Sequence, residues 1–215
     1  MSRSETTDTT ALPEAAPDES ARPQRADARR NRDLLLAAAA EVYDERGIDA
    51  SLEEIARRAG VGIGTLYRHF PTRDAVTEAV YRREVGLLCG GVDELLADNA
   101  TDVALALWMR NFAGYVARKK GMAMALKSVL GADSELFTHS HQRIRTAMGT
   151  LIAAATEAGT IRNDVEPDDL LRAMGGICMA TDSADWADRT TRLVDLLVDG
   201  LRYGAPGAAA TRLTE

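Results

Sequence analysis

Residues 51–70, SLEEIARRAGVGIGTLYRHF, decide the fold of this chain. Ser51 precedes an amphipathic run and Glu54 follows three positions later, which is the spacing of a helix-capping box. A Gly-Val-Gly triplet at positions 60–62 interrupts that run, and a second short helix is expected over about Ile63–Phe70, where a proline stops it. A helix, a short turn containing glycine and a second short helix together predict a helix-turn-helix.

The two short helices divide their residues between a small core and an exposed face. Ile55, Ala56, Val61, Leu66 and Phe70 are expected to pack inward, and Gly60 is expected to take the positive φ that a sharp turn requires. The remaining face of the second helix carries Gly64, Thr65, Tyr67, Arg68 and His69. A helix with such a face can enter a major groove about 12 Å wide, where threonine and arginine meet base edges and tyrosine and histidine donate to phosphate oxygens.

Helices are also predicted on both sides of this motif, so the expected fold class is all-α. The first helix begins near Asp27–Asp33 and ends before Gly47. Thr72 can cap a helix that runs toward Leu96 and is kinked or divided at Gly90-Gly91. The remaining start and stop signals predict five more helices, at Thr101–Lys120, Met122–Leu130, Ser134–Ala158, Pro167–Thr181 and Asp188–Tyr203.

Composition narrows the possible classes of protein. The chain has 215 residues, of which 46% are hydrophobic and 27% charged, enough for one large domain or two small ones. The longest apolar run, Leu34–Ala40, is far shorter than the ~20 residues of a membrane span. With no visible secretory signal and only two cysteines, we expect a cytoplasmic protein without disulfides or a membrane partner.

Charge is distributed unevenly along the chain. The net charge is -7, but residues 22–84 hold twelve arginines against eleven acidic residues. This pattern suits a polyanion contact confined to one module of an acidic protein. On charge alone, arginines that simply solvate helices explain the count better.

The segment from Leu34 to Val76, LLLAAAAEVYDERGIDASLEEIARRAGVGIGTLYRHFPTRDAV, resembles the TetR family of transcriptional regulators. Departures from the family pattern are mild: Tyr43 stands where phenylalanine is usual, Arg73 where lysine is frequent and Val76 where leucine is frequent. The resemblance implies a DNA-binding regulator that is not an enzyme and uses no cofactor. It also implies a helix-turn-helix domain at 25–72 and a helical ligand-binding and dimerisation domain at 73–204. The polar, aperiodic composition of the N-terminus predicts a disordered tail at 1–24, and a flexible C-terminus is expected at 205–215.

The resemblance further implies roles for individual residues. Residues 52–59 would form the supporting helix and residues 64–70 the recognition helix, with Arg25 and Arg32 within reach of the DNA backbone or minor groove. The predicted DNA contacts are Arg29, Arg30, Ser51, Gly64, Thr65, Tyr67, Arg68, His69, Thr72 and Arg73.

The larger C-terminal region suggests an effector site and a dimer interface. Methionine and aromatic residues are typical of adaptable apolar pockets, although plain core packing is the better explanation for any single methionine. The candidate pocket residues are Trp108, Phe112, Met122, Leu126, Met148, Ile152, Met174 and Cys178. Two apolar stripes predict a homodimer through Leu170, Leu171, Ile177, Leu193, Leu196, Leu197 and Leu201.

The expected function is a homodimeric repressor that binds a palindromic double-stranded DNA operator and is released by a small apolar or amphipathic effector. Activation in place of repression stays open. One alternative is a metal-responsive regulator that uses His139 and Cys178, although His139 and His141, at i and i+2, do not share a helix face. Another alternative is a protein-interaction module that has lost DNA binding. An enzyme is not expected, because no nucleophile elbow, P-loop or dinucleotide fingerprint occurs.

Overall fold

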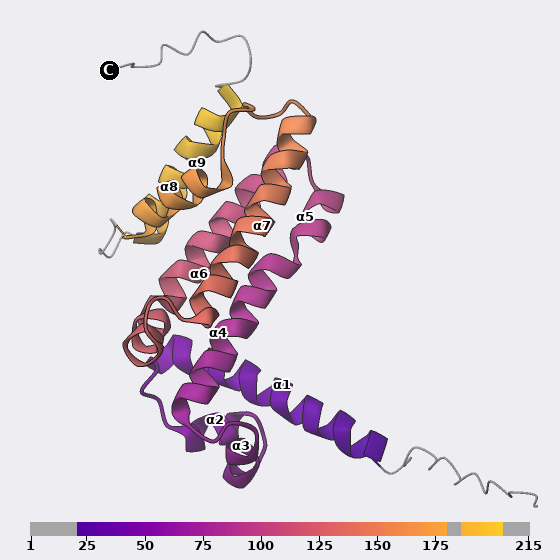
Figure 1. Ribbon diagram of the computed structural model, residues 1–215, viewed down its shortest axis with the longest axis vertical. Helices are drawn as coiled ribbons and strands as arrows, with labels where there is room; N and C mark the ends of the chain where they lie inside the picture. Colours follow the sequence, from indigo (N-terminus) through magenta and orange to yellow (C-terminus); the bar gives the residue numbers. More distant parts are fainter. Residues whose placement is uncertain (1–20, 180–185, 204–215) are drawn as a thin grey trace, which may run out of the picture.

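The computed structural model describes residues 21–179 and 186–203, with backbone only for 21–25 and 203. Within these residues the chain is helical and contains no strand (Figure 1), which confirms the all-α expectation. The helices are α1 Ala21–Arg46, α2 Leu52–Arg58, α3 Ile63–His69, α4 Arg73–Gly90, α5 Val92–Asp98, α6 Thr101–Leu130, α7 Glu135–Glu157, α8 Pro167–Met179 and α9 Trp186–Tyr203. The expected tail over 1–20, the expected end at 205–215 and Thr181 lie outside the described residues. None of the described helices is both long and apolar enough to cross a membrane.

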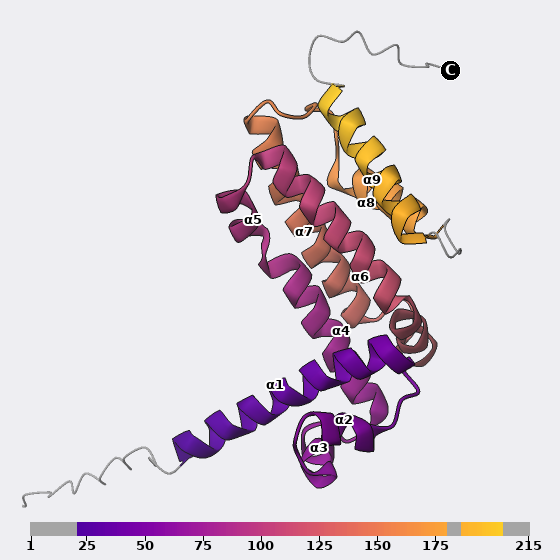
Figure 2. The ribbon, with the colours of Figure 1, turned by 180° about the vertical axis from the view of Figure 1, so that it is seen from behind.

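The helices form an elongated molecule with the helix-turn-helix at one end. In both views α2 and α3 lie beneath α1 and the start of α4, and α3 lies at the tip (Figures 1 and 2). Helices α4, α6 and α7 run side by side along the long axis, and α8 and α9 form a pair on one flank. Because α4 belongs to both ends, it is the element through which the ends are joined.

Two of the predicted helix boundaries need correction. Helix α1 begins at Ala21, so residues 21–24 are helical rather than part of a tail. Pro23 does not oppose this extension, since it lies in the first turn, where a backbone N–H has no intrahelical partner. Helix α6 continues through Gly121, where a break was expected, because the buried Tyr115, Met122 and Leu126 keep helical spacing across it. One exposed glycine costs only about 1 kcal/mol in a helix, which burial of that face outweighs.

One continuous core connects the nine described helices. Trp108 is a central member: its indole is 1% exposed, its ring stacks on Phe112 at a centroid distance of 5.6 Å, and its Nε1 donates to the Leu88 carbonyl over 2.9 Å. That hydrogen bond satisfies the indole donor inside the core. It also fixes α6 against the carboxyl-terminal half of α4.

A buried lysine joins the helix-turn-helix end to the helical bundle. Lys119 on α6 is 2% exposed, and its Nζ donates to Asp44 Oδ1 on α1 over 2.7 Å and lies 3.5 Å from Glu84 Oε2 on α4. A buried ammonium group is tolerated only when carboxylates compensate for the water it has lost. Helices α1, α4 and α6 are therefore held at one point by a single cation.

Replacing Lys119 with alanine is expected to lower the free energy of unfolding by about 2–3 kcal/mol, because two carboxylates then face each other without their shared cation. The lower end of that range applies if water reaches Asp44, whose side chain is 35% exposed. The measurement is urea unfolding followed by circular dichroism. Arg118→Ala is the matched control. Arg118 is 52% exposed, and its Nε lies 3.8 Å from Asp44 Oδ2, which is a weaker contact than that of Lys119. Equal losses in the two variants would contradict a structural role for the buried lysine.

Candidate nucleic-acid interface

The turn between α2 and α3 is built by local hydrogen bonds around one glycine. Gly60 has φ +70°, the left-handed conformation expected for it. The Gly60 N–H donates to the Arg57 carbonyl over 3.1 Å, and the Val61 N–H donates to the Ala56 carbonyl over 3.0 Å. These two bonds form the Schellman pattern that ends a helix at a glycine. The chain is thereby turned sharply enough for Leu66, which is 0% exposed, to pack against the same core as Ile55.

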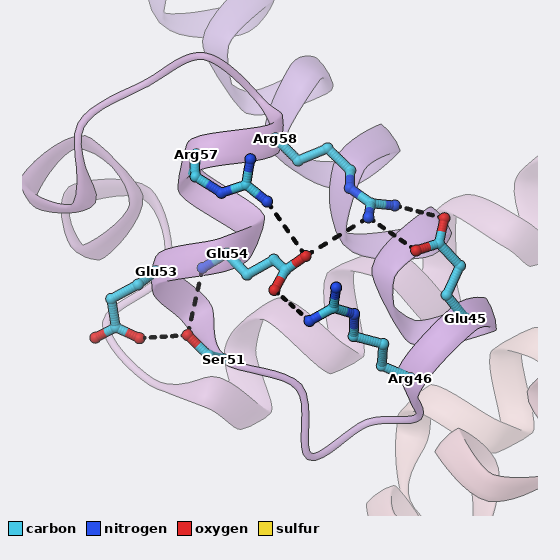
Figure 3. Close-up of polar contacts among 7 residues, drawn as sticks. All are labelled: Glu45, Arg46, Ser51, Glu53, Glu54, Arg57 and Arg58. Atoms are coloured by element: carbon cyan, nitrogen blue, oxygen red, sulfur yellow. Dashed lines mark hydrogen bonds and ion pairs between the residues drawn. The ribbon is translucent and has the colours of Figure 1, made fainter.

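Helix α2 is capped by Ser51 as the sequence predicts, but the side chain of Glu54 pairs with arginines. Ser51 Oγ accepts the Glu54 N–H over 3.3 Å, as in a capping box, and donates to Glu53 Oε2 over 2.7 Å (Figure 3). The Glu54 carboxylate turns away from the cap toward three arginines. It lies 2.6 Å from Arg46, 3.4 Å from Arg57 and 3.6 Å from Arg58.

Arg58 extends this ion-pair cluster to α1. Its guanidinium donates to both carboxylate oxygens of Glu45 over 2.6 and 2.8 Å, the fork geometry that makes such pairs directional (Figure 3). Hydrogen bonding from Arg58 holds the pKa of Glu45 below its ordinary value. The supporting helix is therefore tied to α1 by charge as well as by its apolar face, and the orientation of α3 depends on that attachment.

The outward face of α3 carries the polar side chains expected there. Tyr67 is 46% exposed, Gly64 and Arg68 are exposed, and Thr65 and His69 are half-buried. Arg68 folds back along its own helix, where Nε donates to the Gly64 carbonyl over 3.2 Å and Nη2 donates to Thr65 Oγ1 over 3.1 Å. The face is thus a compact polar surface at the tip of the molecule, and its DNA contacts stay predictions.

Arg73 occupies a position that the sequence did not reveal. Its Nη1 donates to the Ile48 carbonyl over 3.0 Å and to the Ala50 carbonyl over 2.5 Å, so the half-buried guanidinium closes the turn between α1 and α2. Neighbouring Thr72 is exposed and caps α4 by accepting the Ala75 N–H over 3.1 Å. Both predicted DNA contacts therefore also have a structural role: Arg73 joins α4 to the α1–α2 turn, and Thr72 caps α4.

The arginines of α1 differ in what they contact. Arg30 pairs with Asp27 at 3.0 Å on the exposed surface, and the Arg32 guanidinium lies 5.3 Å from the centre of the Phe70 ring. Arg29 is exposed and forms no ion pair with another described residue. The side chain of Arg25 lies outside the described residues.

The candidate effector-pocket residues are brought together, but as a packed core. All eight are buried, with exposed fractions from 0% at Met148 and Met174 to 8% at Phe112. Two of the eight border separate hollows: Phe112 one of about 450 Å³ between α6, α7 and α8, and Trp108 one of about 310 Å³ between α4, α5 and α6. A ligand pocket among these eight side chains stays a prediction.

The candidate dimer residues separate into two groups. Leu170, Leu171 and Leu201 are buried in the subunit's own core, although Leu201 also borders the hollow described next. Leu196 is 69% exposed, and it lines an open hollow of about 490 Å³ with the other three, Ile177, Leu193 and Leu197. The inward stripe of α9 is formed instead by Thr190, Val194 and Val198. The four-residue spacing of these three residues is the sequence signal for this stripe. The predicted stripe consists instead of leucines of the same helix.

The metal-responsive alternative finds little support. Across residues 21–179 and 186–203, no three His, Cys, Asp or Glu side chains are grouped so as to hold a metal ion. His139 and His141 are exposed and border different hollows, whereas Cys178 is buried. Burial also raises the pKa of the Cys178 thiol to about 11, which opposes formation of the thiolate that a metal requires.

Comparisons with known proteins agree with this geometry. Residues 35–80 match the family described as bacterial regulatory proteins, tetR family, and residues 100–203 match the C-terminal domain of SbtR-like transcriptional regulators. An HTH-type transcriptional regulator of Staphylococcus aureus, SAR0097, is 33% identical over 81 residues, which are 36% of this chain and 42% of that protein. The chain thus matches less than half the length of that relative.

Two solved structures resemble most of the chain. The TetR transcriptional regulator SCO0520 from Streptomyces coelicolor has a TM-score of 0.72 and 47% identity, over 80% of this chain and 98% of that one. A TetR regulatory protein from Mycobacterium vanbaalenii has a TM-score of 0.69 and 33% identity, over 84% of this chain and 99% of that one. With the helix-turn-helix exposed at one end and a helical domain behind it, the chain belongs to the TetR family of transcriptional regulators, DNA-binding proteins that are not enzymes.

Proposed function

We propose that the chain is a homodimeric repressor that binds a palindromic operator through α3 and leaves it when a small effector binds the C-terminal helices. The observation that carries this proposal is the division of α3 into two faces. Leu66 is 0% exposed and anchors the helix, while Tyr67, 46% exposed, stands outward at the tip of the molecule. An anchored helix with a free polar face is the arrangement that direct readout of a major groove requires.

Within that proposal the polar residues of the tip have separate tasks. Gly64 and Thr65 lie at the start of α3, where a recognition helix meets base edges. Tyr67 and His69 contact phosphates, and Arg29 reaches the backbone from α1. The exposed Ser51 and Thr72 mark helix starts that can face phosphates, because unpaired N–H groups gather there. Arg68 acts through Thr65, whose hydroxyl it holds.

Dimerisation is proposed through the exposed faces of α8 and α9. Leu196 on α9 and Met179 on α8 are 69% and 62% exposed, and Leu196 lines an apolar hollow with Ile177, Leu193 and Leu197, so these helices present contiguous apolar surface. Exposed Gly176 would let a partner helix approach closely, and two helices from each subunit would make an isologous four-helix bundle. A dimer is needed because one short recognition helix reads too few base pairs for selectivity.

Effector release requires a connection between the two ends of each subunit, and α4 with the Lys119 ion pairs supplies one. An effector that prefers a different position of α4 shifts the population away from the DNA-binding form. A tenfold loss of operator affinity needs a difference of only about 1.4 kcal/mol between the two forms.

Selection of bound duplexes from a random DNA pool tests the proposed function. The expected result is a palindromic sequence whose half-site centres are separated by about one helical turn, roughly 34–36 Å. Recovery of unrelated duplexes, or of none, would contradict operator binding by paired recognition helices.

Replacing Tyr67 with phenylalanine is expected to weaken binding to every duplex by the same factor, roughly tenfold, since one hydrogen bond to a charged phosphate is lost. The dependence on salt should not change, because the lost group is neutral. Arg29→Gln, by contrast, should reduce the slope of log K against log[salt] by about 0.9 for each chain, since it removes one phosphate-neutralising charge. Fluorescence anisotropy over a salt series measures both effects. Sequence-dependent losses in Tyr67→Phe would argue against a phosphate contact.

Replacing Leu196 with glutamate is expected to shift the protein from dimer to monomer, because a charge would be buried between two apolar helix faces. Light scattering after size exclusion measures the mass, and operator affinity should fall at least a hundredfold, about 2.7 kcal/mol. Leu87→Glu is the matched control, since Leu87 is 60% exposed on α4, away from α8 and α9. A dimer that survives Leu196→Glu, or is lost equally in the control, places the interface elsewhere.

A further inference from the structure

One arginine of the C-terminal domain lies in a hollow without an ionic partner. Arg143 on α7 is half-buried and forms no hydrogen bond or ion pair with another described residue. Its Nη1 and Nη2 lie 3.8 and 3.9 Å from the point where a Cβ of Gly86 on α4 would stand. A half-buried guanidinium without a protein acceptor keeps five N–H donors that only water or a ligand can satisfy. The neighbouring Arg145 shows the usual solution, since its Nε bonds both oxygens of Asp168.

The hollow around Arg143 has the dimensions of a small-molecule site. It measures about 320 Å³ and lies between α4, α5 and one face of α7. Val92, Ala147 and the half-buried thiol of Cys89 provide apolar surface. The α7 residues that line it are spaced three and four apart, so they face it together: His139, Gln142, Arg143, Thr146, Ala147 and Thr150.

The polar groups of the hollow favour a single negative charge. The hydroxyls of Thr146 and Thr150 already donate to the carbonyls of Gln142 and Thr146, over 2.9 and 3.1 Å, so they present only lone pairs. Donors remain on Arg143 and on the Gln142 amide. Asp93 also borders the hollow from the first turn of α5 and repels any negative charge that does not lie against Arg143, so there is room for one anionic group only.

Cys89 shows that the charge of Arg143 reaches into the hollow. Burial raises the pKa of the Cys89 thiol, and the positive charge of Arg143 acts in the opposite direction. An anion seated on Arg143 would cancel that second effect and cover the sulfur. Both consequences make the thiol less reactive, because the thiolate is the nucleophile.

We propose that this hollow binds a small organic monocarboxylate, with its carboxylate on Arg143 and its apolar body against Val92 and Ala147. Guanidinium and carboxylate form paired hydrogen bonds, which explains why an arginine is left unpaired here. This inference rests on the proposed function only in making that carboxylate the effector. It places the effector on the α4–α5–α7 side of the bundle, not among the eight buried side chains predicted from the sequence.

A carboxylate bound in the hollow would lie close to the contacts that join α4 to the DNA-binding end. Gly86, beside the Arg143 guanidinium, is two residues from Glu84, which contacts Lys119 at 3.5 Å. Both residues lie on the same turn of α4. A ligand that occupies the space beside Gly86 would therefore lie against the turn of α4 whose Glu84 contacts Lys119.

The test uses the full chain and four probes: hexanoate and benzoate, with hexanamide and benzamide as their uncharged counterparts. Alkylation of each cysteine by iodoacetamide is followed by peptide mass spectrometry. Buried Cys178 serves as an internal control for general stabilisation. Arg143→Gln removes the proposed ligand contact, and Arg145→Gln removes the same charge from the same helix on the side that borders the Phe112 hollow.

At least one carboxylate should slow the alkylation of Cys89 at least fivefold and leave the alkylation of Cys178 unchanged. The same carboxylate should bind Arg143→Gln at least tenfold more weakly than it binds the wild type or Arg145→Gln. The amides should have no effect. Failure of both carboxylates at high millimolar concentration, equal protection by the amides, or unchanged binding to Arg143→Gln would overturn the site. Loss of binding in Arg145→Gln alone would place the carboxylate in the Phe112 hollow and also overturn it.

Operator binding is measured separately, with the duplex chosen by selection. Release by the bound carboxylate in wild type but not in Arg143→Gln would support its role as effector. Thiol protection without release would overturn that role and leave the binding site standing. If selection yields no operator, the proposed function fails, while the thiol experiment still decides whether the carboxylate site exists.

Discussion

A single buried ammonium group determines how the two ends of this molecule are related. Lys119 contributes its charge from α6, and Asp44 and Glu84 contribute the opposing charges from α1 and α4. Apolar burial is not itself directional, although the interdigitated core limits how far these helices can shift. A buried cation restricts them further, because any shift that lengthens its contacts leaves a charge without water or a partner. The orientation of the helix-turn-helix is therefore set inside the bundle and not only at its own small core.

Helix α4 has a double role as a result. Its first turn carries Arg73, whose guanidinium closes the turn between α1 and α2, and its middle carries Glu84. Its carboxyl-terminal half receives the Trp108 hydrogen bond through the Leu88 carbonyl. A displacement of α4 thus changes contacts at both ends of the molecule. Under the proposed function, α4 could couple effector binding to operator binding, because this one rigid helix has partners at both ends of the molecule.

Local rules of sequence predict most of this fold, and they fail where a distant contact decides. The helix-turn-helix was readable because Gly60, Ser51 and the spacing of Ile55 and Leu66 act over a few residues. The continuity of α6 through Gly121 was not, because burial of Met122 and Leu126 against other helices outweighs a local preference. The partners of Arg73 and Lys119 lie 23 or more residues away, so no periodicity reveals them. Arg143 had no sequence signal, because what distinguishes it is the lack of an ion pair with any described carboxylate, which only the arrangement in space reveals.

The difference between local rules and distant contacts also explains why the number of arginines is a poor guide to the DNA-binding surface. Arginine is frequent in residues 22–84, but most of the described guanidiniums there have internal tasks. Some are paired to carboxylates, such as Arg46 and Arg58; Arg73 is bonded to backbone carbonyls, and Arg32 lies over an aromatic ring. Such charges still contribute to the potential at the tip, but their counter-charges reduce it at the range of a Debye length. Under the proposed function, sequence selectivity would then come from the side chains that α3 presents to base edges, while arginines without a carboxylate partner, such as Arg29, would supply the phosphate contacts.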